Sequence, residues 1–332
     1  MNPIQKVIEK AAWRIRRLCG ADRILRKQYE HRDQLFLELT KQRHQLDRLT
    51  SYVEHSWAGE GGFEERTDFR RLRELTQLLS PMDISGAKYR RIGRDYDGGY
   101  VMVDDFPSSI EAAYSLGIND DVSWDEEIAN RGIPIFMYDH TIDRLPKLNP
   151  LFKFFREGVS GSAAGAGFET LSNLIRRNGH QNAKNLILKM DIEGYEWSVL
   201  KDTPDELMEK FSQIVVELHD ITPKGTDYEF QGILSVLKKI NTTHQAVHVH
   251  ANGNSQVYWF CGLALPSLLE VTFVRRSSYG SRLVPNTRAY PTEIDQPTAP
   301  WLPEIPLAIF SAKNLPSGIA GLAAAALKQG AS

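Results

Sequence analysis

Short apolar runs and helical segments alternate along the middle of this chain, and this alternation is the feature that most restricts its fold. Residues 110–117, 133–141, 151–159, 185–191 and 213–220 have the pattern of strands, and 244–252 and 257–265 that of a closing pair joined by a turn. Helical patterns follow at 121–132, 168–179, 195–202 and 227–241. The alternation predicts a parallel sheet with helices on both faces. Such sheets bind ligands at the carboxyl ends of their strands, so chemistry is expected there.

The composition is typical of a soluble globular protein. The 332 residues are 42% hydrophobic and 25% charged, enough for one large domain or two smaller ones. A net charge of −2 offers no global attraction for nucleic acid. Cys19 and Cys261 are too few for a disulfide framework, and no apolar run approaches the roughly 20 residues that span a bilayer. A cytoplasmic location is therefore expected.

Composition divides the chain into four segments. Residues 1–55 contain almost no Gly or Pro and are expected to be helical, with a short heptad seam in their second half. A linker at 56–68 precedes the main domain at 69–310, and 311–332 form a low-complexity tail. The N-terminal helices could pack on the main domain or join copies of the chain as a coiled coil. Because residues 1–27 carry eight bases and two acids, contact with an anionic membrane surface is a third alternative.

Two residues stand directly after the first two predicted strands, where a ligand should bind. Gly117 follows the first strand and lets the backbone approach a ligand closely, but the dinucleotide fingerprint G-x-G-x-x-G is absent. Asp139 follows the second strand, in a position suited to accept hydrogen bonds from a ribose diol. The alternatives are an ordinary turn at Gly117 and a loop or N-cap carboxylate at Asp139.

Charged residues also end the fourth and fifth predicted strands. Strand side chains alternate with period two, so Lys189 shares a face with Asp191, and Glu217 shares one with His219. If the strands are parallel neighbours with Asp191 level with His219, then Lys189 is level with Glu217. This register predicts a structural ion pair between Lys189 and Glu217. It also predicts that Asp191 and His219 meet at the rim of the sheet as functional groups.

Two further histidines raise the question of a metal. His248 and His250 share one face of the sixth predicted strand. With Asp191, Glu217 and His219 they could form a site for a divalent ion, because such nitrogen and oxygen ligands suit several metals. They could equally be solvent-facing or hydrogen-bonded core residues, and the metal stays open.

Several stretches of the chain match a known family. "FMYDHT", "FETLSNLI", "LKMDIEGYEWSVL" and "IVVELHD" resemble FkbM-type S-adenosylmethionine-dependent methyltransferases, as do "RIGRDYDGGYVM" (91–102) and "LLEVTFVRR" (268–276). The likeness implies the Rossmann-like class I methyltransferase fold, a seven-stranded sheet whose last strand is antiparallel. It also implies that the loop at Gly117 cradles the methionine part of the cofactor and that Asp139 holds the ribose. Asp191 would face the methionine amino group and sulfonium, or the acceptor.

Three turns near the implied site have roles that the resemblance leaves open. The glycine-rich first motif that is usual in methyltransferases is reduced here to "SLGIND". Asn119 or Ser123, at the start of a helix, is therefore expected to hold the cofactor carboxylate. "DYDGGYVM" predicts a hairpin, in which Asp97 or Tyr100 either lies at the cofactor rim or only shapes the turn. After the fourth strand, residues 193–194 are expected to turn into a helix whose first turn carries Glu196.

The resemblance implies S-adenosylmethionine as cofactor and a hydroxyl of a sugar, polysaccharide or related natural product as acceptor. An alcohol has a high pKa and is a poor nucleophile, so the enzyme must align the reacting atoms and remove the hydroxyl proton. His219 is the expected general base, assisted by Asp191 or Glu217, with a divalent ion as the alternative. A second function class is a catalytically silent scaffold acting through its N-terminal helices. A nucleotide-dependent oxidoreductase is disfavoured by the missing glycine fingerprint.

Overall fold

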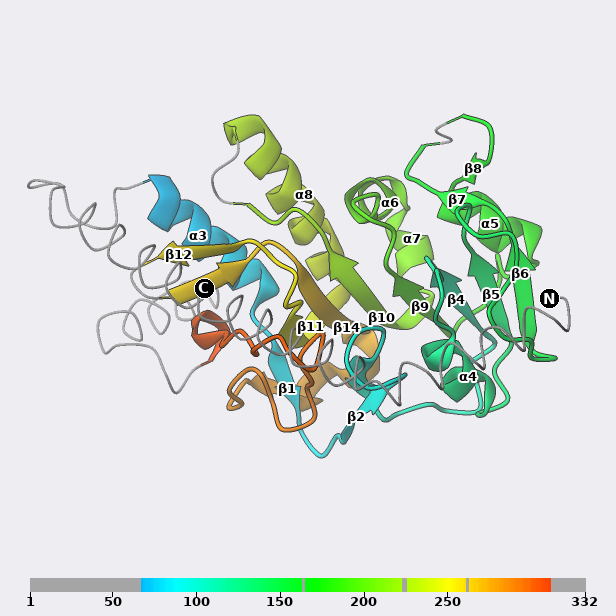
Figure 1. Cartoon of the computed structure of the whole chain (residues 1–332), viewed down its shortest axis with the longest axis horizontal. Helices are drawn as coiled ribbons and strands as arrows, with labels where there is room; N and C mark the ends of the chain where they lie inside the picture. The colour runs from blue at the N-terminus through cyan, green and yellow to red at the C-terminus, as the bar shows by residue number, and fades with distance from the viewer. Residues whose placement is uncertain (1–66, 163–164, 223–225, 261–262, 312–332) are drawn as a thin grey trace, which may run out of the picture.

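The computed structural model describes residues 67–311, apart from 163–164, 223–225 and 261–262. The expected helices of residues 1–55, most of the linker and residues 312–332 of the tail lie outside the described residues. The described chain begins with helix α3 (Thr67–Leu79), which is followed by a large sheet and its covering helices (Figure 1).

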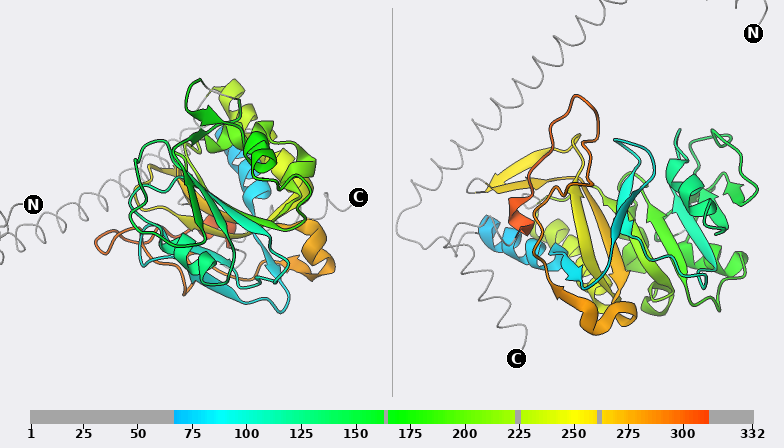
Figure 2. Two further views of the ribbon diagram at one scale, coloured as in Figure 1. Left: turned by 90° about the vertical axis from the view of Figure 1, so that its right-hand side faces the viewer. Right: turned by 90° about the horizontal axis from the view of Figure 1, so that it is seen from below.

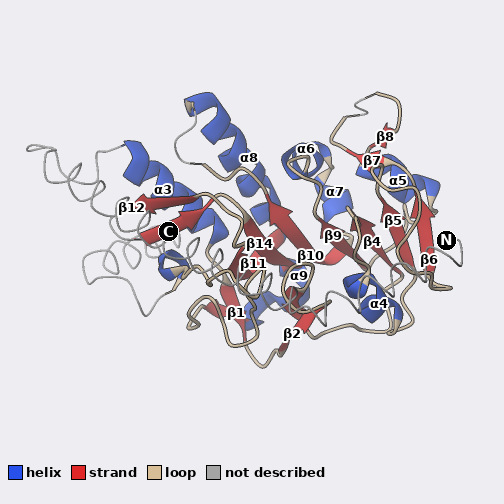
Figure 3. Ribbon diagram, viewed as in Figure 1, coloured by secondary structure: helices blue, strands red, loops and turns tan. Residues whose placement is uncertain are grey.

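Seven strands form the central sheet, in the order β11-β14-β10-β9-β4-β5-β6 (Figure 3). They are β4 (Ala112–Leu116), β5 (Ile135–Tyr138), β6 (Phe152–Phe155), β9 (Leu186–Met190), β10 (Phe211–Leu218), β11 (His244–Ala251) and β14 (Leu269–Arg275). β14 is antiparallel to both of its neighbours, and the other pairs are parallel. The sheet confirms the seven-stranded, mostly parallel architecture with one antiparallel strand. The chain reverses its direction of progress across the sheet between β4 and β9, which is where such sheets bind ligands.

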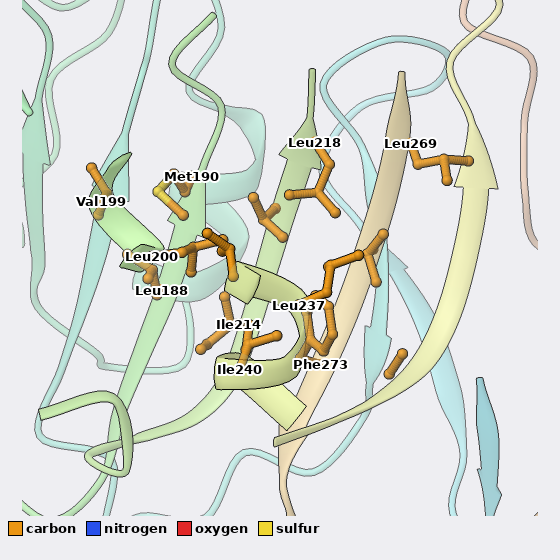
Figure 4. Close-up of a cluster of buried hydrophobic side chains, with 14 of the residues drawn as sticks. Leu188, Met190, Val199, Leu200, Ile214, Leu218, Leu237, Ile240, Leu269 and Phe273 are labelled. Carbon is orange, nitrogen blue, oxygen red and sulfur yellow. The ribbon is translucent and has the colours of Figure 1, made fainter. Parts of the chain in front are cut away.

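Each face of the sheet has its own apolar core, because alternate strand residues point to opposite sides. Leu186, Leu188 and Met190 of β9 belong to one core, and Ile187 belongs to the other. The first core is covered by α3, α5 (Leu171–Arg177), α6 (Glu196–Asp202), α7 (Asp205–Met208) and α8 (Asp227–Thr243). Figure 4 shows Leu237 and Ile240 of α8 among the strand side chains of this core. Helices cover the opposite face as well, as expected, and the end-on view in Figure 2 shows them on both sides of the sheet.

The opposite face is covered by α4 (Ser123–Ala129) and by a hairpin of β2 (Tyr89–Ile92) and β3 (Tyr100–Val103). The hairpin confirms the turn predicted from "DYDGGYVM". Its loop is held from two sides, since Arg94 N donates to Ser123 Oγ (2.7 Å) and Asp97 N donates to Thr298 O (3.0 Å). The loop is therefore fixed over the carboxyl edge of the sheet.

The predicted closing pair is wrong. β11 pairs with β14, and the segment expected to pair with β11 instead forms a small hairpin of its own, β12 (Val257–Phe260) and β13 (Leu263–Pro266). β14 is buried along nearly its whole length between β10 and β11. Local turn composition favours neighbours in sequence, whereas a strand buried on both faces is placed by the core.

The predicted third strand also divides into two pieces. β6 joins the large sheet, while β7 (Gly158–Val159) pairs with β8 (Phe168–Glu169). Short elements complete the described chain: β1 (Met82–Ile84) with β15 (Leu283–Pro285), α9 (Arg276–Tyr279), η2 (Gly280–Arg282) and η3 (Ala308–Phe310).

Candidate active site

A cavity of about 700 Å³ opens at the carboxyl edge of the sheet. It is lined by residues that follow β4, β5, β9, β10 and β11, and by the loop of the β2–β3 hairpin. The six residues expected to be catalytic or to bind the cofactor line it: Gly117, Asn119, Asp139, Asp191, Glu217 and His219. Ser123, the alternative to Asn119, is not among the lining residues, and its Oγ donates to Asp121 Oδ2 (2.8 Å). The topology brings them together because the carboxyl ends of parallel strands share one edge.

The loops after β4 and β9 touch through their backbones. Asp191 N donates to Leu116 O (2.9 Å). Gly117 has φ +80°, and a Cβ built on it would lie 1.6 Å from Asp191 O. Only glycine fits this contact, since any side chain would force the two loops apart. The glycine thereby brings the loop that follows β4 against the end of β9.

Asp139 fastens the next part of the β4 loop. Its Oδ2 accepts hydrogen bonds from Ile118 N (2.8 Å) and Asn119 N (2.9 Å), and its Oδ1 accepts from Thr141 N (2.7 Å) and Thr141 Oγ1 (2.6 Å). Burial by itself would raise the pKa of Asp139, but these hydrogen bonds outweigh it and lower the pKa. The predicted ribose contact stays a prediction, and a ribose would share these oxygens with the loop amides.

The register of β9 and β10 differs from the expected one. Lys189 pairs with Val215 and Met190 with Val216, so Asp191 continues level with Glu217. The prediction of a Lys189–Glu217 ion pair is wrong, because each of the two side chains has another partner. Lys189 Nζ instead donates to Gly117 O (2.8 Å), and Glu217 Oε1 accepts from Asn252 Nδ2 (2.8 Å). The lysine therefore supports the β4 loop.

Carboxylates surround the inner part of the cavity. The pKa of Glu217 is raised well above its usual range. The main cause is burial, and the nearby charges of Asp191, Glu270 and Asp97 add to it. Burial, Glu270 and Asp191 likewise raise the pKa of Asp97. Tyr100 Oη donates to Asp191 Oδ2 (3.2 Å), so both hairpin residues considered from the sequence face this cavity. Concentrated negative charge of this kind favours a cationic ligand.

His219 is fixed at the rim by α6. Its Nδ1 lies 3.1 Å from Glu196 Oε1 and 3.2 Å from Glu217 O, and Trp197 Nε1 donates to its carbonyl oxygen (2.7 Å). Its Nε2 lies 3.4 Å from an oxygen of the exposed Glu193. Burial disfavours the imidazolium, yet Glu196 and the nearby charges of Asp191 and Glu193 raise the pKa of His219 to about 9.

Glu196 has a larger role than the helical first turn that the sequence predicts for it. The side chain is fully buried and accepts hydrogen bonds from Ile192 N (2.7 Å) and Gly194 N (2.9 Å). The signal that could have found it is the spacing of carboxylates in "DIEGYE" after a buried strand. A turn between a strand and a helix does not require three acidic residues in six, so this spacing indicates that some of them have another role.

The histidines of β11 do not join this cavity. His248 Nε2 lies 2.9 Å from Asp295, and His250 lies 3.1 Å from Glu270 and 2.9 Å from Glu304. The set of five metal ligands considered from the sequence is therefore not assembled.

Ligand atoms of Asp191, Glu196 and His219 do lie within 4.8 Å of one another. Both oxygens of Glu196 already accept hydrogen bonds, however, one of them from the turn amide of Ile192 and one from that of Gly194. This arrangement provides no support for a metal ion.

The segment with most of these rim groups runs from β8 through β10 to the first residue of β11. It contains Asp191, Glu196, Glu217 and His219. Residues 168–244 match the family model of the methyltransferase FkbM domain. The FkbM match confirms the resemblance seen in the sequence and implies a class I methyltransferase fold, in agreement with the sheet order.

The FkbM match does not extend to Gly117, Asn119 or Asp139, whose roles rest on geometry. No curated protein matches the chain. Among residues 67–311, leaving out the three gaps, no helix is both long and apolar enough to cross a membrane.

Proposed function

We propose that this protein is an S-adenosylmethionine-dependent O-methyltransferase whose acceptor is a hydroxyl of a sugar, a polysaccharide or a related natural product. The observation that carries the proposal is the acidic cavity at the carboxyl edge of the sheet. Part of its rim, with Asp191, Glu217 and His219, lies in the FkbM-matched segment.

The cavity residues fit this cofactor in charge and in size. The volume of about 700 Å³ lies within the range of small-molecule sites. Asp191 and the carboxylates around it suit the ammonium and sulfonium charges, and the loop of Gly117 and Asn119 suits the methionine part. The rings of His140, Phe168 and Tyr195 follow one another at the mouth, with centroids 4.7 and 5.4 Å apart, and offer stacking surface. S-adenosylmethionine supplies a methyl group that its sulfonium already activates.

The chain must then bind the acceptor and remove its proton. Nε2 of His219 faces groups at the cavity rim and can accept the hydroxyl proton as general base. Asn252 and Asn254 also line the cavity, and Asn252 Nδ2 donates to Glu217 Oε1. Amides and carboxylates are good partners for a hydroxyl-rich acceptor, which supports a saccharide. The scaffold alternative depends on residues 1–55, outside the described part of the chain.

Calorimetric titration with S-adenosylmethionine tests the cofactor, and transfer of a labelled methyl group to a panel of glycans tests the acceptor. We expect micromolar or tighter binding by the wild type and at least about tenfold weaker binding by Asp139→Ala. The matched control is Asp143→Ala, because the Asp143 side chain is 81% exposed and is not among the cavity-lining residues. Absence of wild-type binding would reject the proposed function. Binding without transfer to any hydroxyl would reject the acceptor class.

A further inference from the structure

We infer that Glu196 is a positioning residue: its buried carboxylate fixes a proton on Nδ1 of His219 and so leaves Nε2 of the imidazole as the atom that accepts the substrate proton. The meaning of this contact for catalysis rests on the proposed function. The state of the imidazole itself can be measured without any turnover.

The contact is built from two segments that meet at the edge of the sheet. Glu196 begins α6, after the turn that leaves β9, and His219 follows β10. Neither oxygen of Glu196 is free to turn away, because Oε1 accepts from Ile192 N and Oε2 accepts from Gly194 N. The backbone of His219 is held in turn by Trp197 Nε1. Both partners of the 3.1 Å contact are therefore fixed in place before any ligand binds.

The neighbours of Nδ1 decide where the proton lies. Among the described residues, the two atoms within hydrogen-bond distance are Glu196 Oε1 and Glu217 O, and neither a carboxylate nor a carbonyl oxygen can donate. Nδ1 must therefore carry a hydrogen. A neutral imidazole has a single N–H, so its Nε2 is then unprotonated and can accept a proton.

The groups around His219 also determine when Nε2 is free to act. The acids that face the ring are Glu196, Asp191 and Glu193, and together they favour the imidazolium in the free protein. Glu193 lies at Nε2, but it is 88% exposed and its charge is screened by water. A cationic cofactor beside Asp191 acts in the opposite direction and favours release of the proton. His219 would thus become a base when the cofactor is in place.

A purely structural role for Glu196 makes different predictions. As a cap for the two turn amides, it would affect stability and would leave the titration and tautomer of His219 unchanged. As a positioning residue, it sets both. Glu196→Gln keeps the size of the side chain and removes its charge, although its amide group then faces one backbone N–H.

The decisive measurement is nitrogen-15 NMR of the histidine side chains in the wild-type protein, with His219 assigned by comparison with His219→Asn. We expect the neutral ring at high pH to be the Nδ1–H tautomer. An Nε2–H tautomer would overturn the inference even if the protein proves to be a methyltransferase. Because this arm uses wild-type protein, it stands even if Glu196→Gln does not fold.

The variants add a second readout. In Glu196→Gln we expect the pKa of His219 to fall by about one unit or more, and the acid limb of methyl transfer to move to lower pH by the same amount. Glu193→Gln should move the titration much less, and Glu206→Gln, exposed on α7, should not move it. An unchanged His219 titration in folded Glu196→Gln would overturn the inference.

Discussion

Gly117 and Asp191 lie in backbone contact across the carboxyl ends of β4 and β9, so closely that a Cβ on Gly117 would lie 1.6 Å from Asp191 O. The contact joins the loop proposed to hold the methionine part of the cofactor to the carboxylate proposed to face its charge. Lys189 adds to it by donating to Gly117 O. The geometry of the candidate site therefore depends on a glycine outside the FkbM-matched segment.

Gly117→Ala should weaken cofactor binding more than the control variant Gly132→Ala does. The added methyl group must displace Asp191 O, so we expect the Kd for S-adenosylmethionine to rise at least about tenfold. Gly132→Ala is the matched control. Gly132 has φ +81° against +80° at Gly117, but a Cβ there meets no atom of the described residues within 4 Å. Both variants carry the strain of a left-handed alanine, about 1–2 kcal/mol. Equal binding by the two variants would contradict the proposed role of the contact.

Asp139→Asn should loosen the β4 loop. An amide cannot replace both carboxylate oxygens as acceptors for Ile118 N, Asn119 N and Thr141, so we expect faster hydrogen exchange at those three amides. The lowered pKa of Asp139 implies stability that is present above its unfolded value of 3.8 and is lost as pH falls through the folded value. The stability advantage of the wild type over the variant should therefore be largest at neutral pH and should shrink as the pH falls below 3.8. Unchanged exchange at Asn119 would contradict this account, and Asp143→Asn serves as control.

Glu217→Gln should stabilise the ligand-free protein at alkaline pH. A raised carboxyl pKa implies stability that is complete below the unfolded value of 4.5 and is lost as pH rises through the folded value. Glutamine removes the buried charge and keeps an acceptor for Asn252. We expect a gain of roughly 1 kcal/mol at pH 8, or about 2–4 °C in Tm, and little gain at pH 4.5. The same variant should bind the cationic cofactor more weakly. A fall in Tm at pH 8 would show that the charge is compensated in the folded protein.

Cofactor binding should release protons from His219. At pH 8 the imidazole, with its pKa raised to about 9, is mostly charged in the free protein. A sulfonium near Asp191 favours the neutral ring, whereas S-adenosylhomocysteine lacks that charge. Calorimetry in buffers of different ionisation enthalpy should therefore detect more proton release with S-adenosylmethionine than with S-adenosylhomocysteine. The carboxyls of Glu217 and Asp97 can also release protons, so His219→Asn is the control that isolates the imidazole. If His219→Asn shows the same difference in proton release between the two ligands as the wild type, His219 is not the source of the released protons.

The kind of sheet, and the edge of it that carries the candidate site, could both be predicted from the amino-acid sequence. Alternating apolar and helical patterns are local, because each strand or helix shows its own period along the chain, and parallel strands necessarily share a carboxyl edge. Gly117, Asp139, Asp191 and His219 could be proposed from that rule and from the FkbM-like motifs. The β2–β3 hairpin was predictable for the same reason, since its turn is set by adjacent residues.

Tertiary structure alone decided the register and the partners. Nothing in either strand specifies that Lys189 lies level with Val215, because the offset between β9 and β10 is fixed by the cores on both faces of the sheet. That offset turned an expected Lys189–Glu217 pair into two separate contacts. It was likewise packing that inserted β14 beside β10 and buried Glu196 against His219. Glu196 and His219 are 23 positions apart in sequence, and they become partners only when β9, β10 and α6 have packed together.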